Sequence, residues 1–126
     1  MTATVHSLAA RESAAIPLDQ LQRLYDRLGE AATRDLLERS VLTIAAAPRM
    51  LRAAVSDGNA RALATQARHL RRVARGLHFT DLERVARDLE HCTLREDRHA
   101  SAAVACRLAR LCEAFLNWAE APRASG

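Results

Sequence analysis

The feature that most constrains the fold is a series of five amphipathic stretches, in which apolar residues recur every three or four positions. This spacing is typical of α-helices that bury one face. The stretches span about residues 18–28, 31–56, 60–77, 80–92 and 99–120. Aromatic residues make up only 3% of the chain, which also favours helices over strands. The sequence therefore predicts an all-α chain: an antiparallel four-helix bundle with a short additional N-terminal helix.

Each stretch has an apolar face that we expect to enter the core. These faces comprise Leu18, Leu21, Leu24, Tyr25 and Leu28 in the first stretch; Leu36, Leu37, Val41, Ile44, Leu51 and Val55 in the second; Leu63, Ala67, Leu70, Ala74 and Leu77 in the third; Leu82, Val85, Leu89 and Cys92 in the fourth; and Val104, Leu108, Leu111, Phe115 and Trp118 in the fifth.

Residues that start or stop helices mark the boundaries between the stretches. Gly58 can adopt the left-handed conformation that ends a helix, and Asn59 can cap the helix that follows. Thr80 and Glu83 form a capping-box signature for the fourth helix. Pro48 lies inside the second stretch, but the apolar phase continues across it. One bent helix is therefore favoured there over two helices.

The length of 126 residues suits one domain, which we expect at 16–120 between loose tails at 1–15 and 121–126. No stretch approaches the ~20 apolar residues of a membrane span, and the N-terminus lacks the pattern of a secretion signal. Cys92, Cys106 and Cys112 are odd in number and lie in apolar helical patterns without zinc-site spacing. We expect a cytoplasmic protein with reduced, buried cysteines, no metal and no cofactor.

The third stretch separates into an apolar face and a basic face at about 100° per residue. A helical wheel places four arginines opposite the apolar side. Arg71 flanks these four, and His69 lies near the other edge of the basic face. The four are Arg61, Arg68, Arg72 and Arg75. No acidic residue occurs in 59–77, so these like charges repel one another by a few tenths of a kcal/mol per pair. Such a face suggests an acidic partner.

The same helix carries a motif that resembles the histidine phosphotransfer (HPt) domain of two-component signalling. The family motif runs Ala-His-x-Leu-Lys-Gly, and this chain has Ala-Arg-His-Leu-Arg-Arg at 67–72. Arg68 stands where the family has its phosphate-accepting histidine, Arg71 where it has lysine and Arg72 where it has glycine. The resemblance extends over about 18–118. It includes Leu21, Leu24 and Gly29 near the start, Asp57-Gly58-Asn59 before the motif helix and Leu89-Glu90 in the next helix.

The resemblance implies a phosphorelay module that docks the receiver domain of a response regulator or a sensor histidine kinase. A guanidinium stays protonated and is no useful phosphoryl acceptor, so Arg68 predicts docking without phosphotransfer and no catalytic residue. Arg71 can still serve electrostatically as the family's lysine does. The docking residues would be Arg61, Arg68, His69, Arg71, Arg72 and Arg75.

Several alternatives stay open from the sequence. His69 could itself accept the phosphoryl group if it is exposed, or it could pack its ring edge at the boundary of the helix. The basic face could be an ordinary solvated surface, partly neutralised by acidic residues of the fourth helix. A basic nucleic-acid-binding module is disfavoured, because the net charge is only +4 and no aromatic residues lie among the arginines. A dimer with Trp118 at its contact remains possible.

Overall fold

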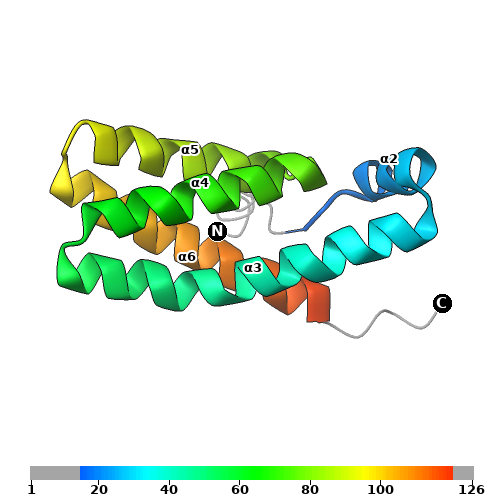
Figure 1. Cartoon of the computed structure of the whole chain (residues 1–126), viewed down its shortest axis with the longest axis horizontal. Coiled ribbons are helices and arrows are strands. Elements are labelled where there is room, and N and C mark those ends of the chain that lie inside the picture. The colour runs from blue at the N-terminus through cyan, green and yellow to red at the C-terminus, as the bar shows by residue number, and fades with distance from the viewer. Residues whose placement is uncertain (1–14, 121–126) are drawn as a thin grey trace, which may run out of the picture.

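The structure, a computed structural model, describes residues 15–120, and these residues are almost entirely α-helical (Figure 1). The helices are α2 (Leu18–Leu28), α3 (Glu30–Asp57), α4 (Ala60–Leu77), α5 (Thr80–Leu94) and α6 (Arg98–Glu120). No strand occurs within this part of the chain, so the predicted all-α class is confirmed. Apart from Ala15, the predicted tails lie outside the described residues, and so does Pro122, at which the fifth stretch was expected to stop.

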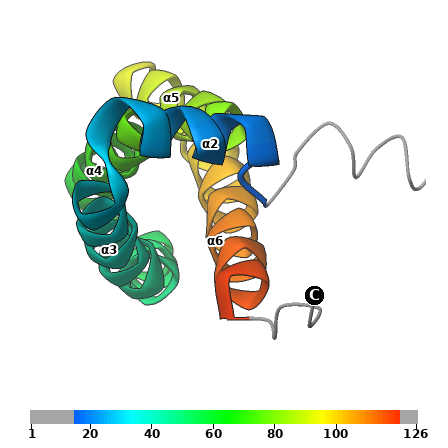
Figure 2. The same ribbon diagram turned by 90° about the vertical axis from the view of Figure 1, so that its right-hand side faces the viewer.

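Helices α3 to α6 pack side by side, and each runs opposite to its neighbour in the chain (Figure 1). Helix α4 lies between α3 and α5, and α6 packs against both α5 and α3 (Figure 2). Helix α2 lies over the first half of α3, beyond the ends of α4 and α5 (Figure 1). The outer side of α4 is therefore left open to solvent along its length.

The predicted apolar faces of α4 and α5 are confirmed as core. Every predicted core residue of these two helices is 5% exposed or less. On α6, Leu108, Leu111 and Phe115 are buried with them, whereas Val104 and Trp118 are partly buried. Burying one leucine fully contributes roughly 1.5–3 kcal/mol, so this shared core fixes which side of α4 faces outward.

Most of the predicted helix boundaries agree with the structure. Gly58 takes the left-handed conformation (φ 63°) at the end of α3, and the Asn59 side chain accepts a hydrogen bond of 3.0 Å from the backbone N–H of Ala62. Helix α3 passes through the buried Pro48 as one helix, as the apolar phase predicts. The charged segment before α6 also caps that helix, because the Asp97 side chain accepts a hydrogen bond of 3.0 Å from the backbone N–H of Ala100.

The predicted capping box at Thr80 and Glu83 is wrong. Helix α5 begins at Thr80 itself, and Phe79 holds the N-cap position without a side-chain hydrogen bond. Phe79 is only 2% exposed, and its ring centroid lies 5.4 Å from that of Phe115. Packing of this ring in the core therefore sets where the helix starts. The Glu83 carboxylate is free to bond elsewhere.

The predicted apolar face of α2 is buried only in part. Leu24 is fully buried, and Leu21 and Tyr25 are partly buried, but Leu18 is 82% exposed and Leu28 is 41% exposed. The periodicity of α2 is that of a helix packed along its whole face. Because α2 packs on α3 at the end of the molecule, only the middle of that face is covered.

Candidate functional site

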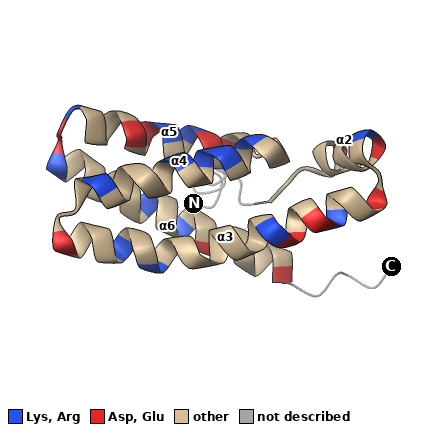
Figure 3. Ribbon diagram, in the orientation of Figure 1, with Lys and Arg blue, Asp and Glu red and all other residues tan. Residues whose placement is uncertain are grey.

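The outer face of α4 carries the arginines that the sequence singled out. Arg61, Arg68 and Arg72 are exposed, on the side of the helix opposite the buried Leu70. Figure 3 shows the blue positions of α4 with no red position on that helix. The neighbouring part of α3, residues 39–56, also lacks acidic residues. A continuous acid-free surface therefore extends over two adjacent helices.

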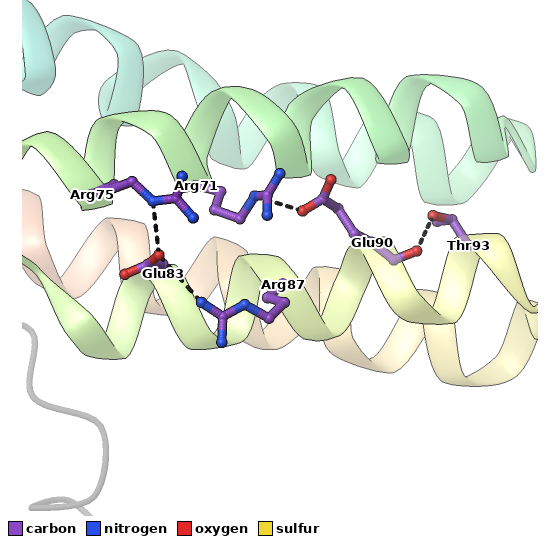
Figure 4. Close-up of polar contacts among 6 residues, drawn as sticks. All are labelled: Arg71, Arg75, Glu83, Arg87, Glu90 and Thr93. Carbon is purple, nitrogen blue, oxygen red and sulfur yellow. Dashed lines mark hydrogen bonds and ion pairs between the residues drawn. The ribbon is translucent and has the colours of Figure 1, made fainter.

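Two of the predicted docking residues bond to α5 within the fold. Arg71 Nε lies 2.8 Å from Glu90 Oε1, and Arg75 Nε lies 3.2 Å from Glu83 Oε2. Figure 4 shows both arginine side chains directed from α4 toward the acidic residues of α5. Arg87 of α5 also donates to Glu83 Oε2, at 3.2 Å. The acidic residues of the fourth predicted helix thus neutralise part of the basic face.

These ion pairs lie in a partly covered seam between the two helices. The side chains of Glu90 and Glu83 are only 17% and 18% exposed, whereas those of Arg71 and Arg75 are 34% and 66% exposed. Low exposure strengthens an ion pair, and it also makes an unpaired carboxylate costly. Arg71 is therefore held more firmly to α5 than Arg75. Both arginines position α4 against α5.

Three arginines of the predicted set have no carboxylate partner within residues 15–120. Arg68 makes one long hydrogen bond of 3.4 Å, from Nη2 to Thr65 Oγ1 of its own helix. The side chains of Arg61 and Arg72 make no hydrogen bond or ion pair in the described part of the chain. Their spacing in sequence places all three on one line along the outside of α4. We call Arg61, Arg68 and Arg72 the free arginine row.

His69 is exposed, and among the described residues its ring has no hydrogen-bond partner. The helical rotation of about 100° between neighbours turns it from Arg68 toward the side of α4 that meets α3. It is therefore more open than a histidine that packs its ring edge against a neighbouring helix. The ring is therefore accessible to solvent or to a partner.

A polar contact between α4 and α3 was not predicted from the sequence. Gln66 is only 7% exposed, and its Nε2 donates to Met50 Sδ of α3 at 3.3 Å. The contact holds the thioether of Met50, a side chain that is 49% exposed, where α3 packs on α4. The helical wheel could have found Gln66, because it lies between Leu63 and Leu70 on the core side of α4.

The remaining candidate groups in the described part of the chain are the possible metal ligands and the cysteines. No cluster of His, Cys, Asp or Glu there could hold a metal ion. Cys92 and Cys112 are buried free thiols, and burial raises the pKa of the Cys112 thiol to about 12. Cys106 is only partly buried, which corrects the prediction that all three cysteines are buried. Within 15–120, no helix has the length and apolar character needed to cross a bilayer.

One further ion pair lies on the side of α3 that faces α6. The Arg52 guanidinium binds the Glu113 carboxylate of α6 with both nitrogens, at 2.6 and 2.9 Å. This hydrogen bonding lowers the pKa of Glu113 and raises that of Arg52. Arg52 is thus tied to α6 and adds little to the basic surface of α4.

A scan against models of protein families, a search of curated proteins and a search of solved structures each give no match. The resemblance to HPt domains therefore stays a prediction that depends on the motif residues.

Proposed function

We propose that this chain is an HPt-like module of two-component signalling, an antiparallel four-helix bundle that docks a receiver domain or a sensor histidine kinase without accepting a phosphoryl group. The observation that carries the proposal is the Arg68 side chain, which is exposed on the outside of α4 and has no carboxylate partner within the described residues. A relay protein of this family would present its imidazole at that position. Partners of this kind also imply a cytoplasmic location.

The docking surface that we propose is narrower than the basic face read from the sequence. It consists of the free arginine row and His69 on α4, together with the exposed Met50 on the neighbouring α3. Arg71 and Arg75 act as positioning residues, because their bonds to Glu90 and Glu83 hold α4 on α5. Three cations without internal partners favour an acidic surface such as the pocket around a receiver's aspartate. The exposed thioether of Met50 adds an apolar contact of adaptable shape.

The test is a binding titration of the whole chain against the receiver domains and histidine kinases of the same genome, taken one at a time. Arg68→Gln and Arg72→Gln should each weaken binding roughly five- to tenfold, since each removes a charge-assisted contact. Arg110→Gln, which removes an exposed arginine of α6, is the matched control and should leave affinity unchanged. Raising the salt concentration should weaken the native complex more than the Arg68→Gln complex.

Two results contradict the proposal. The first is that none of the receivers or kinases binds. The second is that a partner binds with the same affinity to the native chain, to Arg68→Gln and to Arg72→Gln.

One specific observation favours a second candidate, an active phosphotransfer protein that uses His69. The His69 ring is exposed and without a hydrogen-bond partner among the described residues, so one nitrogen can reach a phosphoryl donor. Incubation with a radiolabelled phosphorylated receiver separates the two candidates. Docking alone predicts no acid-labile label on this chain. Label that disappears in His69→Gln establishes the active alternative.

A further inference from the structure

A second site lies at the end of the molecule where the α3–α4 and α5–α6 connections meet (Figure 1). A cavity of about 350 Å³ opens there, within the size range of small-molecule sites. Its apolar lining includes Ala54, Val55 and Leu63, and its polar lining comprises Thr93, Glu96, Arg98 and Ser101. No residue of the free arginine row lines the cavity, although Arg61 directly follows Ala60 in sequence.

Ser101 is the most buried of the polar residues that line the cavity. Its side chain lines the cavity and is only 5% exposed, yet its hydroxyl has no hydrogen-bond partner within residues 15–120. No fully buried side-chain nitrogen or oxygen lacks a partner within residues 15–120, so the Ser101 hydroxyl is in reach of solvent. A polar group of a ligand can replace the water there. The Thr93 hydroxyl donates to the backbone oxygen of Glu90 at 2.8 Å, so its oxygen can still accept a hydrogen bond.

Two opposite charges lie at the same cavity without bonding to each other. Arg98 has no carboxylate partner and Glu96 has no basic partner among the described residues. The Nη2 atom of Arg98 lies 2.8 Å from the position that a Cβ would take at Gly58, so the absence of a side chain there makes room for the guanidinium. Ala60 and Arg98 also begin α4 and α6, whose N-termini favour negative charge.

We propose that this cavity binds a small zwitterion with an apolar side chain, a free amino acid of the leucine or valine type. Arg98 binds the carboxylate through two parallel hydrogen bonds, and Glu96 accepts from the ammonium group. Ser101 and Thr93 complete the polar contacts, and the apolar lining takes the side chain. A simple anion would face the carboxylate of Glu96 and a simple cation the guanidinium of Arg98, so one ligand that carries both charges satisfies the site.

The experiment is an amide-resolved NMR titration of the whole chain with L-leucine. We expect saturable shifts at Gly58, Ala60 and Ser101. 4-Methylpentanoate and 3-methylbutylamine keep the isobutyl side chain of leucine but carry only one charge each. Both should bind at least roughly tenfold more weakly than L-leucine. Arg98→Gln and Glu96→Gln should each weaken L-leucine binding to a similar extent. Arg110→Gln, on the exposed side of α6, should leave the affinity for L-leucine unchanged.

The outcomes that overturn the proposal are distinct. Shifts that grow linearly with L-leucine and do not saturate exclude a site. Equal affinity for either singly charged analogue excludes recognition of a zwitterion. Unchanged affinity in Arg98→Gln excludes the assigned contact, and the dispersed amide spectrum of the variant shows that it is folded.

Discussion

The division of the arginines of α4 into bonded and free groups predicts that two adjacent residues differ in their effect on stability. Replacing Arg71 with Gln leaves the Glu90 carboxylate, which is 17% exposed, without its partner at 2.8 Å. Surface pairs contribute about 0–1 kcal/mol, and breaking a fully buried pair costs about 3–5 kcal/mol. The Arg71 pair lies between these cases, so we expect the free energy of unfolding to fall by about 1–2 kcal/mol.

The matched control is Arg72→Gln, one residue further along α4. Arg72 is exposed and has no carboxylate partner among the described residues, so the free energy of unfolding should change by less than about 0.5 kcal/mol. A small gain is expected, since the substitution relieves repulsion with Arg68. Urea unfolding followed by circular dichroism measures both variants, and in thermal unfolding the Arg71 variant should melt about 5–10 °C lower.

A double-mutant cycle then isolates the pair. Arg71→Gln combined with Glu90→Gln should cost about 1 kcal/mol less than the sum of the two single substitutions. A coupling energy of zero would refute the stabilising role of the Arg71–Glu90 pair. The division into bonded and free arginines would be refuted if Arg72→Gln destabilised the protein as much as Arg71→Gln does.

Three further predictions concern the rest of the fold. The bond to Arg52 lowers the pKa of Glu113, so the pair stabilises the folded state above the unfolded carboxyl's pKa of about 4.3, and this contribution is lost as the pH falls through the lower folded pKa. The native protein should therefore lose more stability on acidification than Glu113→Gln does. Thermal unfolding at a series of pH values measures this difference. In a timed reaction with a thiol reagent at pH 8, Cys106 should react first and the fully buried Cys112 only on unfolding, and equal rates would contradict the burial. Leu70→Ala should cost about 2–5 kcal/mol in urea unfolding, because the side chain is fully buried, and a cost below about 1 kcal/mol would contradict the assigned core.

The parts of the fold that the sequence predicted are those set by interactions close in the chain. The buried face of α4 follows from the spacing of Leu63, Leu70 and Leu77, and the cap at Asn59 depends on a residue three positions away. Helix α2 was predicted less well, because its spacing cannot show that it lies beyond α4 and α5. Exposure of Leu18 is therefore a consequence of tertiary position.

The candidate site was also predicted only as far as interactions within one helix determine it. The helical wheel correctly predicts that Arg68 points outward, but it cannot say which arginines meet an acidic residue of the next helix. That depends on the offset between α4 and α5, which pairs Arg71 with Glu90 and Arg75 with Glu83. The capping-box prediction failed for a related reason, since Glu83 bonds across the helix interface while core packing of Phe79 sets the start of α5.

Docking through the outer face of α4 is tested most directly by amide NMR of the labelled chain during titration, which maps the surface that a bound receiver or kinase covers. We predict that the largest shifts cluster at Arg61, Arg68, His69 and Arg72 on the outer side of α4, with smaller ones at Met50. Shifts concentrated on α5 or α6, with α4 unaffected, would contradict this prediction.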